Sequence, residues 1–135
     1  MRAFVPFLLF ASLVSLSTLA RAQERWTAPA QADSLQNPFR MDDAEVTAQG
    51  KELYLTWCST CHGEQGDGAG EAGQAWNPPP ADFTSEEVRK QADGALFWKL
   101  SNGNPPNMLS YEKVLSEEER WRLVTYLRHL AKDEE

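Results

Sequence analysis

The sequence predicts a small all-α domain, and three patterns favour this fold class. Capping boxes at residues 84–87 and 116–119 are typical of helix N-termini. Apolar residues in the second half of the chain recur at spacings of three and four, which is the periodicity of one helix face. No segment alternates apolar and polar residues as a half-buried strand does. With 135 residues, the chain has room for one domain.

The first 22 residues are expected to be a secretory signal peptide. Arg2 precedes an uncharged, mostly apolar run over residues 3–20, and small residues at positions 20 and 22 form a cleavage site after Ala22. An uncleaved membrane anchor is the alternative, although the run contains four Ser or Thr and is near the lower length limit for crossing a bilayer. We therefore expect a periplasmic or otherwise exported protein.

The charge of the chain restricts its partners. Loss of Arg2 and Arg21 with the signal peptide changes the formal net charge from −7 to −9. Such a charge disfavours nucleic acid and anionic lipid surfaces as partners, and no membrane contact is expected unless the N-terminal segment stays uncleaved. It fits a soluble protein that meets a basic surface on another protein.

Residues 23–41 are expected to form an extended N-terminal arm, because they are rich in Ala, Gln, Pro and Asn without an apolar period. The domain proper is expected at residues 42–135. Its first helix is predicted over residues 42–58, where Asp42 and Asp43 can cap the N-terminus. Gly50 lies inside this predicted helix. A glycine there costs about 1 kcal/mol relative to Ala, and such a residue often marks the close approach of another backbone.

The middle of the domain is predicted to be loop followed by helices. Residues 63–73 hold five of the eight glycines, and residues 78–80 are a stiff run of prolines. The capping box at Thr84 opens a short helix, and a longer one is expected over residues 93–102 with Gly103 as its end. The final helix runs from residue 116 to about 132.

Cys58, Cys61 and His62 form the C-x-x-C-H pattern of covalent haem attachment. Two thiols separated by two residues can each add to one vinyl group at a haem edge, and the next side chain then lies beneath the ring, where imidazole reaches iron. The other imidazole nitrogen is expected to donate to a backbone carbonyl, with Pro79 or Pro80 as acceptor. The motif predicts one haem c, held by Cys58 and Cys61, with His62 as iron ligand.

Three other uses of a cysteine pair remain open. A thioredoxin-like dithiol usually lies in a βαβ context, which this sequence lacks. A zinc site needs four ligands, and His129 is the one other histidine. A plain disulfide is possible in an exported chain. Haem attachment is favoured because a histidine directly follows the second cysteine in a chain that begins with an export signal.

The sequence resembles class I cytochrome c over about residues 46–130. That family has a glycine and an aromatic residue eight and four positions before the first cysteine, matched here by Gly50 and Tyr54. It also has a leucine and an aromatic residue in its last helix, matched by Leu123 and Tyr126. The resemblance implies the cytochrome c fold, a small helical domain wrapped around one covalent haem, in which the first and last helices cross at these residues.

Met108 is the expected second iron ligand. It lies on a predicted loop after His62, where members of the resembled family place their distal methionine, and thioether sulfur raises the reduction potential of haem iron. The sequence departs from the family at Leu109, where proline is common. An ordinary core methionine is the alternative. Met41 and His129 are not expected to bind iron.

Five aromatic side chains are expected to line the haem crevice, namely Trp76, Phe83, Phe97, Trp98 and Tyr111. Of these, Trp98 and Tyr111 are candidates to bind a haem propionate.

A haem bound by both His62 and Met108 has no open iron position, so the sequence predicts a one-electron carrier and not an enzyme. The expected partners are redox proteins, such as a respiratory complex, a terminal oxidase or a dehydrogenase. Two alternatives stay open. The chain could be an electron-transfer subunit of a larger respiratory or dehydrogenase complex, or a haem sensor or peroxidase-like enzyme if Met108 is not a ligand.

Overall fold

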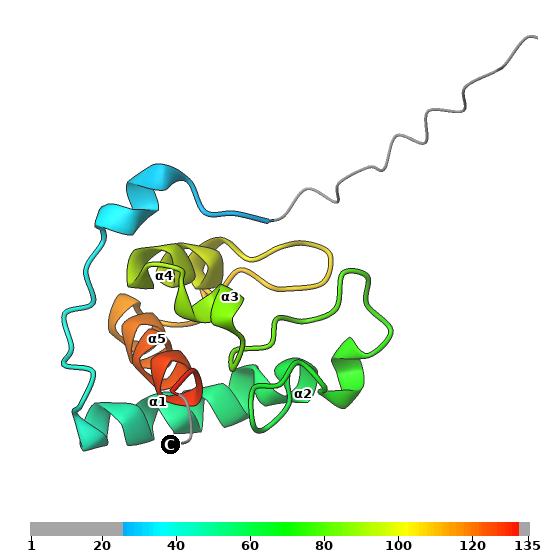
Figure 1. Cartoon of the computed structure of the whole chain (residues 1–135), viewed down its shortest axis with the longest axis horizontal. Coiled ribbons are helices and arrows are strands. Elements are labelled where there is room, and N and C mark those ends of the chain that lie inside the picture. The colour runs from blue at the N-terminus through cyan, green and yellow to red at the C-terminus, as the bar shows by residue number, and fades with distance from the viewer. Residues whose placement is uncertain (1–25, 133–135) are drawn as a thin grey trace, which may run out of the picture.

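The computed structural model describes residues 26–132, which form helices and connecting loops (Figure 1). Within this range, one isolated β-bridge, between Asn104 and Met108, lies outside the helices. The all-α prediction is confirmed, whereas the expected signal peptide lies outside the described residues. In order, the helices are η1 (Ala30–Ser34), α1 (Ala44–Trp57), α2 (Ser59–His62), η2 (Glu71–Gly73), α3 (Glu86–Arg89), α4 (Asp93–Asn102) and α5 (Glu117–Leu130).

The crossing of α1 and α5 forms the centre of the fold, and Figure 1 shows α5 standing across α1. Gly50 lies at the crossing, where a Cβ would overlap the carbonyl oxygen of Arg122. One helical turn later, the ring of Tyr54 packs against that of Tyr126 with centroids 5.3 Å apart. Tyr54 and Leu123 are completely buried. The predicted contact between the first and last helices is therefore present.

Helix N-termini follow the predicted caps with one change. Asp43 caps α1 by accepting hydrogen bonds from the backbone N–H groups of residues 45 and 46. The capping box at Ser116 and Glu119 is complete at the start of α5. At α3 the cap is Ser85, one residue later than predicted, because the N–H and Oγ of Thr84 both bind the Asp82 carboxylate.

The N-terminal arm packs on the domain and is not extended throughout. Its η1 turn lies against α4, above it in the view of Figure 1. Gly94 permits this approach, because a Cβ there would overlap the carbonyl oxygen of the buried Ala32. The Nδ2 of Asn37 also donates to the Oγ1 of Thr125 at 3.0 Å. The arm is thus fixed at both α4 and α5.

Arg128 joins α5 to the segment between α3 and α4. Its Nε donates to the Asp93 carboxylate at 2.6 Å, and its Nη1 donates to the Val88 carbonyl at 3.1 Å. Its Nη2 donates to the carbonyl of Gln91. The guanidinium therefore connects α5 to backbone carbonyls at the C-terminal end of α3 and just beyond it.

No helix within residues 26–132 is both long and apolar enough to cross a membrane.

Candidate functional site

A single helical turn brings both cysteines and the adjacent histidine together. Cys58 closes α1 and caps α2, and the N–H of His62 donates to the Cys58 carbonyl at 2.9 Å. Gly63 ends the turn with a φ of 80°, a conformation that glycine adopts without steric cost. Cys58 is buried, Cys61 is half-buried, and the two thiols are not joined to each other.

The environment of Cys58 differs from that of a redox-active dithiol. Burial, together with the nearby Cys61, raises the pKa of the Cys58 thiol to about 12. Reactive cysteines in thiol–disulfide chemistry have a lowered pKa, because the thiolate is the nucleophile. This environment disfavours the thioredoxin-like alternative.

His62 is buried and its ring is oriented by one backbone contact. Its Nδ1 lies 3.0 Å from the carbonyl oxygen of Ala81. A carbonyl can only accept, so Nδ1 carries the proton and Nε2 keeps a lone pair that can bind a metal. The acceptor is Ala81 and not Pro79 or Pro80 as expected, since the Pro80 carbonyl faces Gly68. Burial also lowers the pKa of His62, which favours the neutral ligand form.

Aromatic contacts support the orientation of His62. The Phe83 ring stacks on the imidazole with a centroid distance of 4.6 Å and an interplanar angle of 26°. Phe83 in turn contacts Tyr54 edge-on at 6.1 Å. The hydroxyl of Tyr54 donates to the Gly63 carbonyl at 2.6 Å, directly after the motif. Three rings and one hydrogen bond thus connect the motif to the helix crossing.

The loop that carries Met108 is held by backbone pairing. Asn104 and Met108 exchange two hydrogen bonds, of 2.9 and 3.0 Å. The N–H of Tyr111 donates to the Leu100 carbonyl at 3.0 Å and ties the end of the loop to α4. Met108 is half-buried and lines the same cavity as His62, whereas the next residue, Leu109, is 64% exposed.

The shared cavity has a volume of about 1020 Å³. This is at the upper end of the roughly 300–1,000 Å³ usual for ligand and cofactor pockets. A cavity of this size with one imidazole, one thioether and a neighbouring pair of thiols suits a haem of the c type.

The aromatic residues expected in the crevice divide into two groups. Trp76 and Phe83 line the cavity. Phe97 is not among the lining residues, because it stacks on Trp121 with centroids 4.0 Å apart. The hydroxyl of Tyr111 donates to the Trp57 carbonyl at 2.9 Å, and neither Tyr111 nor Trp98 lines the cavity.

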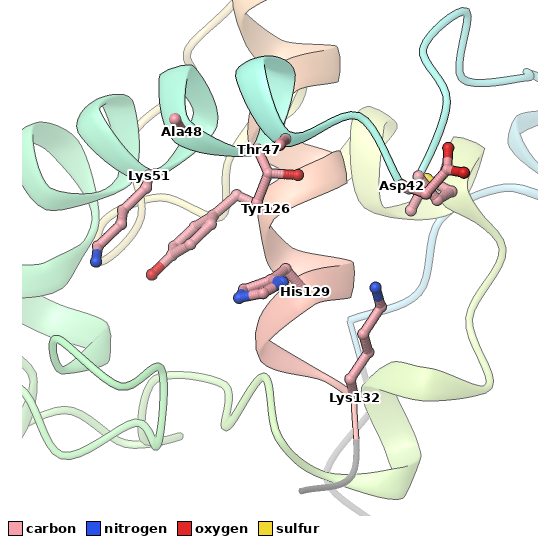
Figure 2. Close-up of a pocket in the computed structure, with 9 residues that line it drawn as sticks. Asp42, Thr47, Ala48, Lys51, Tyr126, His129 and Lys132 are labelled. Atoms are coloured by element: carbon pink, nitrogen blue, oxygen red, sulfur yellow. The ribbon is translucent and has the colours of Figure 1, made fainter.

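A second, smaller cavity of about 380 Å³ lies between the start of α1 and the end of α5. Met41, Lys51 and His129 are among its lining residues. Figure 2 shows His129 between Lys51 and Lys132, with Asp42 at the far side. His62 and Met108 line the larger cavity and not this one, so Met41 and His129 lie in a different cavity from these two residues.

Comparison with known families settles the class of the domain. Residues 45–127 match the family described as cytochrome C oxidase, cbb3-type, subunit III. The chain belongs to this family. The predictions of a class I cytochrome c and of the cytochrome c fold are confirmed. The domain is an electron-transfer domain of the kind that uses haem c.

Solved structures of c-type cytochromes are similar to this chain. A structure titled KustC0563 c-type cytochrome is 30% identical with a TM-score of 0.55, and the match covers 62% of this chain and 98% of that one. The Kuenenia stuttgartiensis reducing HAO-like protein complex Kustc0457/Kustc0458 contains a chain that is 27% identical with a TM-score of 0.60. That match covers 74% of this chain and about half, 49%, of the other. No curated protein matches the sequence.

Several cavity residues of this cytochrome were not anticipated, among them Trp26, Gln91 and Lys99. The sequence did contain a signal for Lys99, because this residue follows Leu96 by three positions and directly precedes Leu100, and both leucines lie on the inward face of α4. A cation on the apolar stripe of a helix indicates a buried anion or a polar cavity. Trp26 and Gln91 carried none, since both lie in segments between or before the helices.

Proposed function

We propose that this c-type cytochrome carries a single haem c and transfers single electrons between exported or membrane-bound redox proteins. In this proposal Cys58 and Cys61 would hold the haem covalently, and His62 and Met108 would bind its iron. Each of the two cysteines would add its S–H across a vinyl double bond of the haem to give a thioether, with sulfur on one carbon and hydrogen on the other. The attachment therefore needs no oxidant.

The observation that carries the proposal is the shared cavity of His62 and Met108 beside the cysteine turn. His62 presents an unprotonated Nε2, because its Nδ1–H is engaged by Ala81. Met108 lines the same cavity from a loop that is hydrogen-bonded to α4. These two residue types are the axial pair of electron-transferring cytochromes.

The chain contributes rigidity to the transfer. The bound haem supplies the one-electron couple between ferrous and ferric iron. Phe83 and Ala81 keep the His62 ring in one orientation, and the bridge to Asn104 does the same for the Met108 backbone. Ligands held in one geometry serve both oxidation states, so little reorganisation accompanies the gain or loss of an electron.

Mass spectrometry of the mature protein, purified from a host with a cytochrome c maturation pathway, tests the covalent attachment. We expect the polypeptide beginning at Gln23 plus the mass of one haem. The double variant with Cys58→Ser and Cys61→Ser should lose that mass. A wild-type protein without bound haem, with two thiols that react with an alkylating reagent, would contradict the proposal and also the predicted export route.

Histidine variants test the first ligand. His62→Ala should abolish the low-spin spectrum, whereas His129→Ala, the matched control in the smaller cavity, should leave it intact. An unchanged spectrum for His62→Ala would exclude this residue as ligand.

The charge of the mature chain supports basic redox partners. A net charge of −9 steers diffusion toward a positively charged surface, and such transient redox complexes bury little area. We expect the rate of electron transfer to a basic acceptor protein to fall as the ionic strength rises. A rate that stays constant between low and high salt would remove charge steering from the proposal.

A role as a subunit of a larger complex is the second candidate. The observation in its favour is the similarity to one chain of the reducing HAO-like protein complex. The match covers about half of the length of that similar chain. Purification from the native host at low salt distinguishes the two functions. Migration as a single small protein supports the free carrier, and stable co-migration with a dehydrogenase or oxidase supports the subunit.

Carbon monoxide separates both functions from a sensor or peroxidase-like enzyme. With Met108 on the iron, the reduced protein should not bind carbon monoxide at neutral pH, because neither axial position is open. Ready binding would favour the enzyme or sensor.

A further inference from the structure

Lys99 places a cationic group on the wall of the haem cavity. Its side chain is half-buried on α4, and it lines the same cavity as His62 and Met108. The Nζ donates to the Oε1 of Gln91 at 2.6 Å. An ammonium has three N–H donors, so two remain for other partners.

The orientation of Gln91 is fixed independently of Lys99. Its Nε2 donates to the Glu87 carbonyl at 3.3 Å, which turns its Oε1 toward the ammonium. Its own carbonyl accepts from the Nη2 of Arg128. Gln91 therefore holds the Lys99 ammonium on the cavity wall by a contact that is anchored in α5.

The N-terminal arm covers the same ammonium. The Nζ of Lys99 lies 5.3 Å from the centroid of the Trp26 ring, and Trp26 also lines the cavity. The close approach of η1 to α4 at Gly94 fixes the arm only a few residues further along. Burial lowers the pKa of Lys99, and Glu87 opposes this effect. An ammonium shielded from water in this way is stabilised by an anion within hydrogen-bond reach.

We propose that Lys99, oriented by Gln91, binds a propionate carboxylate of the haem. This inference rests on the proposed function, because the carboxylate belongs to the haem. A haem carries two propionates on the edge opposite its vinyl groups, and the vinyl edge is the one attached to the cysteines. The ligand class at this site is therefore an alkyl carboxylate, and the interaction is a charge-assisted hydrogen bond.

The proposal predicts two electrostatic effects on the haem. A cation beside the propionate lowers the pKa of that carboxyl group. The same cation disfavours the more positive ferric state and so raises the reduction potential. The potential depends on pH where the propionate titrates, because the two oxidation states of iron differ in their attraction for its charge.

The experiment is a titration of the reduction potential between about pH 5 and pH 9 in three variants and the wild type, with the bound haem of each verified by mass. In Lys99→Gln we expect a lower potential at neutral pH and a pH-dependent region displaced upward by about one unit or more. Lys99→Arg should keep the wild-type titration. Lys51→Gln is the control, because it also removes one positive charge but does so on α1, beside the smaller cavity. It should leave unchanged the pH range over which the reduction potential varies.

If the Lys99→Gln protein does not mature, Lys99→Met takes its place in the experiment, because methionine retains the apolar stem of the side chain. The same upward displacement of the pH-dependent region is expected. A titration curve of the Lys99 variant that superimposes on the wild-type curve would overturn the assignment of Lys99 while leaving the proposed function intact. Absence of haem from the wild-type protein would overturn both proposals. A loss of stability without a displaced titration counts against propionate binding, because it indicates a purely structural role.

Discussion

Gly50 of α1 lies directly against the backbone carbonyl of Arg122 on α5. A Cβ at position 50 would overlap that oxygen and come within 2.9 Å of the Cβ of Tyr126. The obstacle is therefore backbone and the root of a side chain, neither of which can rotate away. The helices meet closely here, and the Tyr54 and Tyr126 rings pack beside the contact.

Gly50→Ala should destabilise the protein by about 1–3 kcal/mol, because overpacking of a tight contact outweighs the gain in helix propensity of about 1 kcal/mol. Denaturant unfolding of the holoprotein measures the change. Glu52→Ala, an exposed site on the same helix, is the control and should stay within about 0.5 kcal/mol of wild type. A stabilised Gly50→Ala protein would show that propensity dominates and that the two helices separate at little cost.

The capping box of α5 should make a small, pH-dependent contribution to stability. The hydrogen bonds from Ser116 lower the pKa of the Glu119 carboxyl from its usual value of 4.5. A lowered folded-state pKa stabilises the protein above the unfolded pKa, and this contribution is lost as the pH falls through the folded-state value. Glu119 is largely exposed, so we expect no more than about 0.5 kcal/mol.

Glu119→Gln tests this contribution, because glutamine still accepts from Ser116 but carries no charge. The variant should be less stable than wild type at pH 7 and equally stable once the pH is well below 4.5. Urea unfolding at the two pH values gives the comparison. A difference between the proteins that is the same at both pH values would argue against the carboxylate as its source. Ser116→Ala should cost about 1 kcal/mol, because the N-cap is removed.

The Arg128–Asp93 pair should contribute more to stability than an exposed ion pair of similar geometry. The two side chains are only 15% and 28% exposed, and Arg128 also serves the carbonyls of Val88 and Gln91. Arg128→Met should therefore cost about 2–4 kcal/mol in unfolding free energy, since the partly buried Asp93 carboxylate loses its charged partner and the two carbonyls lose a donor. Lys90→Met breaks the exposed pair with Glu86 and should cost no more than about 0.5 kcal/mol. Equal effects would show that Arg128 is dispensable for holding the segment between α3 and α4.

Met108→Ala should convert the haem from a methionine-ligated to a carbon monoxide-binding form. We expect loss of the weak far-red absorption band of methionine-bound ferric iron and a lower reduction potential, because thioether sulfur favours ferrous iron. Met41→Ala is the matched control, since Met41 lines the smaller cavity, and its spectrum should equal that of wild type. Retention of the far-red band in Met108→Ala would assign the ligand to another residue.

Local sequence signals predicted most helix boundaries because each of them acts within a few residues. The helix expected over residues 93–102 is observed as Asp93–Asn102, and it ends at Gly103 with a φ of 67°. The capping box of α5 closes between a serine and a glutamate three residues apart. The start of α3 moved by one residue, because the Asp82 carboxylate competes for Thr84.

The support around the candidate haem site depends on contacts that are distant in sequence. The acceptor for His62 is 19 residues away, and the proline run suggested its neighbours and not Ala81 itself. Phe97 was expected in the crevice but stacks on Trp121, since several partners are available to any aromatic ring in a small core. Such choices follow from packing, which a linear pattern does not encode.

The sequence by itself determined the helical class and the attachment motif, because steric demands and reactive groups belong to individual residues, and its resemblance to class I cytochrome c implied the pairing of Gly50 with the last helix. The tertiary structure alone decided which carbonyl orients His62, that Met108 enters the same cavity, and that the arm with Trp26 covers Lys99. The physical reason is that these relationships depend on how helices pack and where loops return. Many side chains compete for each of those positions, and only the folded chain selects one.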